Sequence, residues 1–505
     1  MTNLISFNTP LLVALLGSAS AVSADVTPAQ VWEKYKSTFE NVGYDITATE
    51  QKAGKDLNIT DMTLVVEMSE PAGKVQVSGV DLSLRDNGDG TVTLSMPSVM
   101  TMDIDVDMAD DLDEDIKAEV NYNTSGLDIV VSGSADAMTY TFSAAAMEMA
   151  LGALEVGGEV AEIGEISISM NNVSGTSVLE GTDLISGSRS FAADKLQYLV
   201  DVVDPDGSDE RFFLKGGLSG LVASGKGSVP TDFDPENLTA ALANGFAASG
   251  SIEYAAGASE ASMQGGDEDF TAQSSSSGGA ISFAMDNSEI QYGLMVKDVS
   301  TEATTADFPF PIQIGMSEVG FDLAIPVAES EEPQDFTFGV TLADFTFPDM
   351  IWGLFDPVGQ LPRDPATLIV DLSGKVKMLA NLMDTEAMAM VGDEPAEIHA
   401  LNLNELKLSA AGAELTGDGA VTFDNTDTET FDGIPRPEGA VNLALIGGNA
   451  LLDKLIAMGF VPEQEAMGVR MMVGMFSVPN GPDDLKSTIE FTPEGQIMAN
   501  GQRLK

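Results

Sequence analysis

The feature that most constrains this chain is an alternation of apolar and polar residues that begins near Leu57 and continues for most of its length. The clearest example is MTMDIDVDM at residues 100–108, where every second side chain is Met, Ile or Val and those between are Thr or Asp. Successive side chains of a strand point to opposite faces of a sheet, so the pattern predicts strands with one covered and one wet face. We therefore predict a mainly β protein built on large, curved antiparallel sheets.

Glycine interrupts the apolar side of one predicted strand. In GAELTGDGAVTFD, residues 412–424, Gly417 and Gly419 fall in phase with the apolar residues and not with the acids and threonines. Glycine at such positions removes bulk, so the sheet can bend or another group can approach its backbone. Three groups could fill the room: a helix of the same chain, which we expect first, the sheet folded upon itself, or an acyl chain.

Turn residues and phase changes divide the predicted strands. Residues 73–96 predict a hairpin with a glycine-rich turn. The apolar phase switches between Leu342 and Phe345, which predicts a bulge or a fresh strand. The Ser/Gly-rich stretch 273–279 predicts a loop, and we expect a boundary between two lobes near 264–280.

Helices are expected to be few and short. Thr27 and Pro28 begin an amphipathic N-terminal helix that ends near Gly43, and Asp234 is expected to cap a second helix over 234–246. Further short helices are predicted within 349–355 and 376–390, and a C-terminal helix pair at 449–460 and 462–476.

Methionine is concentrated in the predicted C-terminal helix pair. Its methionines are Met458, Met467, Met471, Met472 and Met475. The unbranched thioether fills irregular gaps in cores and also lines adaptable binding surfaces. We expect core filling here, with a plastic surface for lipid or peptide as the alternative.

The first 24 residues predict an export signal. A short apolar run, Leu11 to Leu16, is followed by small residues and a Val22-Ser23-Ala24 cleavage pattern, although no Lys or Arg precedes the run. The alternative is a short apolar N-terminal helix. We expect a mature, periplasmic chain of residues 25–505, cleaved near Ala24, with no transmembrane segment, because no later stretch has the 18 or more apolar residues of a spanning helix.

The charge balance excludes one class of partner. The chain has 80 Asp and Glu against 23 Lys and Arg, a formal charge of −57. Nucleic-acid binding needs clustered cations, so we expect no nucleic-acid partner. We interpret the acidity as a solvated surface in preference to a calcium-loading one. The absence of cysteine excludes disulfides and thiolate chemistry.

No motif in the sequence predicts catalysis, a metal or a cofactor. His399 is the only histidine, so we expect a polar residue near the start of a strand and not a catalyst or a metal ligand. The acidic stretches RDNGDG and VDPDGSDER resemble calcium loops, but Asp, Asn and Gly are also the standard turn residues, and we expect turns. We therefore expect no enzyme, with a carboxylate-dependent hydrolase as the remaining catalytic alternative.

One aromatic segment is the candidate for contact with a partner. FTFPDMIWGLFDPVGQLPR at residues 345–363 concentrates aromatic side chains, and Trp352, Phe355 and Arg363 are its candidate contact residues. The simpler interpretation, which we favour, is that Trp352 and Phe355 close the end of a core.

Several segments resemble an uncharacterised family of exported bacterial proteins, domain-of-unknown-function family 2125. The segments that carry the likeness are DVTPAQVWEKYK, WGLFDP, LPRDP, LSAAGAELTGDGAVTFDN, GGNALLDKLIAMGF and NGQRL. They extend over essentially the mature chain. The resemblance implies export but no activity and no site residues. The strands are interrupted by glycines and followed by a helix pair, and this pattern is loosely similar to that of AsmA-like envelope proteins. That similarity implies a curved sheet with an apolar groove for lipid.

Three functions follow from these observations. The first is a non-enzymatic periplasmic protein that holds lipid or another hydrophobic ligand on the apolar face of a curved sheet, in maintenance of the envelope. The second is an envelope scaffold or interaction protein whose apolar face is covered by the chain itself. The third, a carboxylate-dependent hydrolase, lacks any motif in its support.

Overall fold

The computed structural model describes residues 25–505 apart from gaps at 42, 69–72, 108–114, 162, 183, 205–209, 232, 235–236, 266–268, 307, 309 and 393. The predicted signal peptide and Met108 of the clearest alternating segment lie outside the described residues. The chain divides into two compact units, the first ending at Thr271 and the second beginning at Ala272. We call them the N-terminal and the C-terminal unit and describe each by itself.

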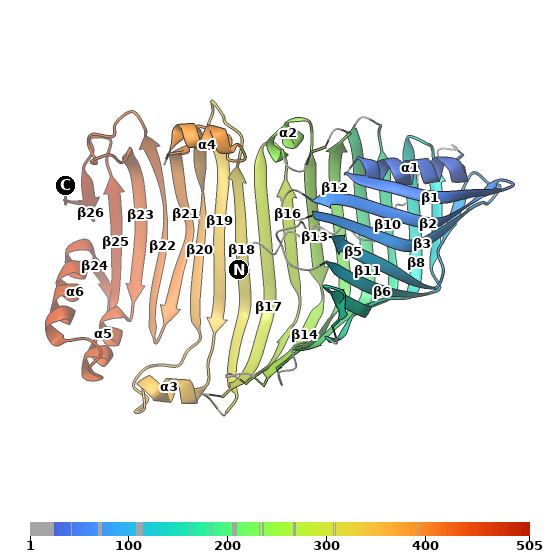
Figure 1. Ribbon diagram of the computed structural model, residues 1–505. Helices are drawn as coiled ribbons and strands as arrows, with labels where there is room; N and C mark the ends of the chain where they lie inside the picture. The colour runs from blue at the N-terminus through green and yellow to red at the C-terminus, as the bar shows by residue number, and fades with distance from the viewer. Residues whose placement is uncertain are drawn as a thin grey trace. The chain divides into compact units, whose positions relative to one another are not determined.

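Strands dominate both units, which confirms the mainly β prediction (Figure 1). The N-terminal unit contains α1 (Pro28–Glu40), β1 (Tyr44–Ala53), β2 (Asp56–Met68), β3 (Gly73–Asp86), β4 (Val92–Ser95), β5 (Val99–Asp107), β6 (Ile116–Ser125), β7 (Asp128–Gly133), β8 (Ala137–Val156), β9 (Glu159–Val160), β10 (Gly164–Glu180), β11 (Leu184–Val203), β12 (Arg211–Pro230), α2 (Leu238–Ala243), β13 (Ala247–Tyr254) and β14 (Ala256–Gln264).

After β15 (Phe270–Ser276), the C-terminal unit contains β16 (Gly279–Met285), β17 (Glu289–Thr305), β18 (Ile312–Pro326), β19 (Gln334–Phe345), α3 (Asp349–Phe355), β20 (Ala366–Met378), α4 (Thr385–Val391), β21 (Ala396–Ala410), β22 (Ala413–Asp424), β23 (Arg436–Ile446), α5 (Gly448–Ala457), α6 (Glu463–Phe476), β24 (Val478–Gly481), β25 (Asp484–Phe491), β26 (Ile497–Ala499) and β27 (Gln502–Arg503).

Antiparallel pairing of strands close in sequence builds each unit. In the N-terminal unit, β1, β2, β3, β5, β6, β8, β10, β11 and β12 pair in that order, and β13 and β14 both pair with β12. The predicted hairpin over 73–96 is confirmed as β3 and β4. In the C-terminal unit, β16 to β23 pair consecutively, and β25, β26 and β27 follow. Short hairpin connections explain why the alternating pattern is so continuous along the sequence.

The predicted N-terminal helix is confirmed as α1. Thr27 and Gln30 form a reciprocal capping box, and Pro28 occupies the first turn. The helix lies against β1, β2 and β3 and buries Val31 and Trp32 on that side. Lys34 is also buried and its Nζ donates to the Gly181 carbonyl oxygen at 2.7 Å, which ties the helix to the turn between β10 and β11.

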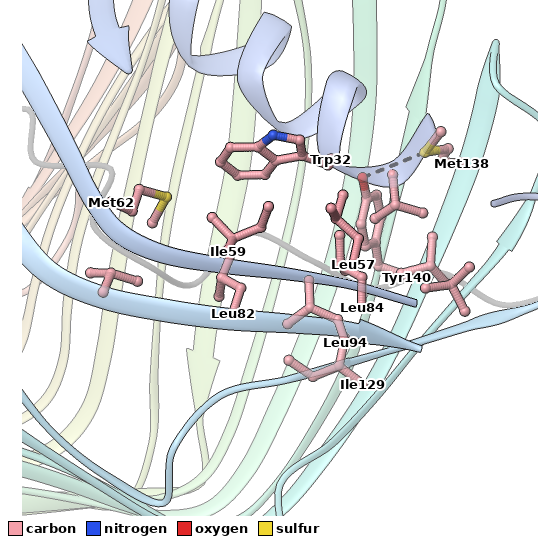
Figure 2. Close-up of a cluster of buried hydrophobic side chains, with 14 of the residues drawn as sticks. Trp32, Leu57, Ile59, Met62, Leu82, Leu84, Leu94, Ile129, Met138 and Tyr140 are labelled. Carbon is pink, nitrogen blue, oxygen red and sulfur yellow. Dashed lines mark hydrogen bonds between the residues drawn. The ribbon is translucent and has the colours of Figure 1, made fainter. Parts of the chain in front are cut away.

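A core of apolar side chains lies beneath α1 (Figure 2). Trp32 faces Ile59 and neighbouring strand residues, and Tyr140 donates a hydrogen bond to the Met138 sulfur at 3.7 Å. Burial of each large apolar side chain stabilises the fold by about 1.5–3 kcal/mol. We call the side of the sheet that carries this core the inner face.

A row of irregular positions crosses the N-terminal unit and shifts the phase of its strands. Asn172 on β10 and Gly220 on β12 have φ of +49° and +61°, and Asn172 Nδ2 donates to Asp194 Oδ2 on β11 at 2.7 Å. The second core cluster shows the effect, because residues three apart on one strand belong to it together: Met170 and Val173, Ala193 and Leu196, and Leu218 and Leu221. The extra residue lies in the same row on each strand, so the apolar inner face continues across the kink.

The C-terminal unit contains the same kind of irregular position, a residue of positive φ at a phase shift. The register of β19 and β20 shifts between Leu342 and Phe345, which confirms the predicted bulge. Asp344 lies at this shift with φ of +52°, and its backbone N–H donates to Thr367 Oγ1 at 3.1 Å. Asp tolerates this left-handed backbone better than most residues, which explains the acidic residue at the bulge.

The neighbouring strand fills the room beside Gly417 and Gly419, so our prediction that a helix lies there is wrong. A Cβ at Gly417 would lie 2.8 Å from Leu443 Cδ2, and one at Gly419 would lie 2.6 Å from the Ala440 oxygen. Leu443 and Val441 of β23 stand directly opposite the two glycines of β22. The glycines therefore serve close packing between strands.

Two local predictions are also wrong. The Ser/Gly-rich stretch is mostly strand β15, and only Ser277 and Gly278 form a turn before β16. Its serines tolerate extended backbone because cross-strand hydroxyl pairs stabilise it, as Ser274 and Thr301 do at 3.0 Å. The second helix begins later than expected, because Asn237 and not Asp234 caps α2 by accepting from the Ala240 N–H.

No helix in the described part of the chain has the length and apolar character needed to cross a membrane.

Substitution of Gly419 by valine tests how the two strands pack. We expect Gly419→Val to lower the free energy of unfolding of the C-terminal unit by about 1–3 kcal/mol, because the new Cβ meets backbone of β23. Urea denaturation measures the effect. Gly468→Ala on α6 is the control: nothing lies within 4 Å of its Cβ, and stability should be unchanged or slightly higher. Equal effects of the two changes would contradict the packing account.

Candidate functional site

A hollow of about 290 Å³ opens on the inner face of the N-terminal unit. Its floor is formed by Gly187 of β11, Gly225 and Gly227 of β12 and Ala248 of β13. Gly187 stands directly opposite Gly227, which in turn stands opposite Ala248. Small residues on three adjacent strands therefore coincide, and the sheet carries a depression there.

Apolar side chains and the end of α1 surround this floor. Leu179 and Ile185 are buried at one side and also belong to the core beneath α1. Phe246 lies at another side, with its ring 5.1 Å from that of Phe233. Thr38 supplies a polar group from α1. Apolar walls with a few polar groups at the rim are typical of sites for small hydrophobic molecules.

Arg189 is the charged residue on the inner face of this hollow. It lies two residues beyond Gly187 on β11, directly opposite Gly225. Part of the side chain is exposed, yet burial among neighbouring atoms lowers the pKa of its guanidinium. Within the described residues its side chain has neither an ion pair nor a hydrogen bond. Ser177, opposite Arg189 on β10, is buried, and its hydroxyl has no hydrogen-bond partner among the described residues.

The inner face is also partly uncovered at the far end of the same strands. Ile168, Phe212 and Met263 are 39%, 43% and 48% exposed. Phe212 stands directly opposite Met263, and Ile168 opposite Tyr198. Aromatic and aliphatic side chains in adjacent rows therefore remain accessible to solvent on the face that elsewhere forms the core.

The candidate contact residues Trp352, Phe355 and Arg363 come together in the C-terminal unit. They line a hollow of about 240 Å³ beside α3. The Trp352 ring stacks on Phe347 at 4.8 Å and lies 5.2 Å from Phe355, so the aromatic residues pack mainly on one another. Arg363 forms an ion pair with Asp349 at the start of α3.

A buried carboxylate fixes the loop that follows α3. Asp356 is fully buried and accepts hydrogen bonds from the Gln360 and Leu361 N–H groups at 2.9 and 2.8 Å. These backbone donors, aided by Arg363, lower the pKa of its carboxyl group. The loop is therefore shaped by an internal anion and not by a bound one.

The methionines of α6 contradict the expectation of core filling. Met467, Met471, Met472 and Met475 are between 55% and 66% exposed, and only Met458 of the group is half-buried. The helix packs on α5 through a narrow seam that includes Ala466, and most of its circumference faces solvent. Sequence reasoning assumed that apolar residues on a helix are covered, but α6 has little neighbouring structure to cover it.

The other candidate residues lie in ordinary surroundings. His399 is on β21, with Nε2 3.6 Å from Glu397. In the turn after β3, the Asp86 and Asp89 carboxylates accept from the Gly88 and Thr91 N–H groups. Part of VDPDGSDER falls outside the described residues. Among those that are described, no group of three or more His, Cys, Asp or Glu is arranged to hold a metal ion.

A comparison with models of protein families gave a match to this chain. A family model described as "Uncharacterized protein conserved in bacteria (DUF2125)" matches residues 231–500, more than half of the chain. The chain belongs to the DUF2125 family. The match includes the β13 residues of the glycine-floored hollow and most of the C-terminal unit, whereas the opening helix precedes it. No curated protein sequence and no solved structure matches this DUF2125 protein.

Sequence reasoning missed the hollow, although its signal was present. Gly187, Gly225 and Gly227 lie in phase with apolar residues of their strands, as Gly417 and Gly419 do in β22. The two sets of glycines differ in the residues that stand opposite them on the neighbouring strands. Leucine and valine of β23 face the glycines of β22, whereas Gly227 of β12 stands between Gly187 and Ala248, and Leu179 flanks Gly187 on its other side. Only the pairing register reveals that difference.

The Asp356 carboxylate makes stability depend on pH in a defined direction. Its folded pKa is depressed, so its contribution is present above the ordinary carboxyl pKa of about 4 and is lost as pH falls through the folded value. We expect Asp356→Asn to destabilise the C-terminal unit at pH 7, with the difference from wild type shrinking at acid pH. Urea unfolding followed by tryptophan fluorescence measures this.

Asp349→Asn is the matched control for Asp356→Asn, because Asp349 is an exposed carboxylate of the same segment. Exposed ion pairs contribute little, so this change should have a small effect at either pH. A pH-independent loss in the Asp356 variant would contradict the role of its charge.

Proposed function

We propose that this DUF2125 protein is a non-enzymatic binding protein that holds a hydrophobic ligand, such as a lipid, in the glycine-floored hollow of its N-terminal unit. The observation that carries the proposal is the coincidence of Gly187, Gly225, Gly227 and Ala248 on three adjacent strands of an otherwise apolar face. Unfilled apolar space costs free energy, so an apolar ligand that occupies the hollow would be stabilised there.

The dimensions favour a slender ligand or one end of a longer one. Complete sites for small molecules usually measure about 300–1,000 Å³, and this hollow is at the lower limit of that range at about 290 Å³. An acyl chain would gain about 25 cal/mol for each Å² of apolar surface that it buries against Ile185, Val229 and Phe246. The partly exposed apolar side chains elsewhere on the inner face, such as Ile252, would support a longer chain.

The predicted signal peptide supports a periplasmic location, and we propose that the ligand is met in the cell envelope. Binding without catalysis is supported by the character of the hollow. Many of the described residues that line it are apolar or glycine, and Arg189, the ionisable side chain among them that faces inward, stays protonated at physiological pH.

A second candidate function, an envelope scaffold, is favoured by exposed apolar residues in the C-terminal unit. Leu354 and Val358 beside Trp352 are 68% and 77% exposed, and the methionines of α6 are exposed as well. Apolar side chains gathered in this way are typical of surfaces that contact another protein.

Filling the hollow tests the ligand-binding function. N-phenyl-1-naphthylamine, a neutral fluorescent probe, should bind the wild-type protein, and Ala248→Leu should weaken that binding by roughly tenfold because the added side chain occupies the hollow. Ala258→Leu is the matched control, since Ala258 is exposed on β14 opposite Gly217. Lack of probe binding by the wild type, or equal binding by both variants, would refute the proposal. Native mass spectrometry of protein purified from periplasm should also show a bound lipid.

Exchange of the exposed residues beside α3 tests the scaffold function. The double variant Leu354→Ser, Val358→Ser should unfold like the wild type, because both side chains are already in solvent. Cross-linking in the periplasm should lose any partner that contacts this segment. An unchanged pattern of cross-links would count against the second function and would not affect the first.

A further inference from the structure

Arg189 lines the hollow without an ion pair among the described residues, and Arg85 on β3 also lacks one. Four arginines are paired: Arg211 with Asp201, Arg363 with Asp349, Arg436 with Asp424 and Asp427, and Arg470 with Asp453. Because the chain has 80 acidic residues, a carboxylate partner for an arginine is readily available. Arg189 nevertheless stands without a carboxylate among the described residues, although its surroundings desolvate it. Partial burial of an unpaired charge costs free energy, which an anionic ligand would recover.

The charges of the residues that line the hollow also differ from those of the chain as a whole. None of the described residues that line it is acidic, and two of them, Arg189 and Lys226, are basic. About one residue in six of the chain is Asp or Glu, so a surface of fourteen residues would ordinarily include some. The ammonium of Lys226 belongs to the opposite face, because Lys226 alternates with Gly225 and Gly227, so Arg189 is the cation that faces a ligand.

We propose that Arg189 binds the carboxylate of a long-chain fatty acid whose hydrocarbon chain lies in the hollow. This inference rests on the proposed function and specifies its ligand. One guanidinium balances one negative charge, and its planar fork matches the two oxygens of a carboxylate. A hollow of about 290 Å³ suits a single chain better than the two chains of a phospholipid.

The register of the strands gives the ligand its direction. Gly225 and Gly250 follow Arg189 in one row across β11, β12 and β13, which leaves open backbone beside the guanidinium for a head group. The next row toward α1 contains Gly187, Gly227 and Ala248, and the row beyond it contains Ile185 and Val229. The chain of the ligand therefore runs from Arg189 over the glycine floor toward the apolar wall.

Paired ligands that differ only in the head group test the inference. Palmitate and hexadecanol have the same chain length, and their affinities are measured by displacement of N-phenyl-1-naphthylamine. We expect the wild type to bind palmitate more tightly than hexadecanol. Arg189→Gln should weaken palmitate binding by roughly tenfold to a hundredfold, the range for loss of a charged hydrogen bond, and leave hexadecanol binding unchanged. Arg189→Lys, which keeps the charge without the fork, should lie between them.

The control is Arg85→Gln, which removes the same charge from an exposed arginine on β3 that has no ion pair in the described part of the chain. Palmitate binding should be unaffected by this change. Arg189→Gln should unfold at the same temperature as the wild type or slightly above it, because no polar contact is lost and the cost of desolvating an unpaired charge is removed.

Three results would overturn the inference, and they are distinguishable. If the wild type binds neither ligand nor the probe, the proposed function itself fails. If it binds palmitate and hexadecanol equally and Arg189→Gln changes neither, the function stands and the role of Arg189 is wrong. If a two-chain phosphatidylglycerol in detergent displaces the probe more effectively than palmitate, the assignment to a single-chain acid is wrong.

Discussion

The need to cover one apolar face of a long antiparallel sheet is the constraint on which the rest of this structure depends. A strand that alternates Met, Ile and Val with Asp and Thr places all its apolar area on one side, and that area must be removed from water. In the N-terminal unit, α1 and the first strands cover part of it and form the core around Trp32 and Tyr140. Farther along β10, β11 and β12 the cover is incomplete, and the hollow and the exposed inner face are found there.

Strands of 17 to 20 residues, such as β10 and β11, are long enough to bend, and a kink in one strand alone would turn its apolar residues to the other face. In this chain, adjacent strands carry an irregular residue in the same row. Asn172, Asp194 and Gly220 mark one such row, and Asp344 marks another in the C-terminal unit. Because the shift is shared, inner residues stay inner on both sides of the kink, and the apolar face remains continuous.

The acidic surface and the unpaired Arg189 of the hollow belong to one electrostatic arrangement. With a formal charge of −57 the chain repels anions in general, so an anionic ligand would need a local cation that is not neutralised by its neighbours. Arg189 meets this requirement because it lies on the apolar inner face, and none of the described residues that line the hollow is acidic. The alternation that builds the fold thus also isolates the charge of the candidate site.

The sequence by itself determined the pleated architecture, the start of α1, the hairpin of β3 and β4, and the bulge between Leu342 and Phe345. Each depends on residues close together in the chain: a capping box, a glycine-rich turn, a switch of phase. Tertiary structure decided what local pattern cannot. The exposure of the α6 methionines depends on how little packs around that helix. The hollow exists because Gly187, Gly227 and Ala248 meet in one row, and the register that aligns them joins residues up to 61 positions apart. Local pattern fixes which face a side chain occupies, but only the pairing of distant strands fixes what stands beside it.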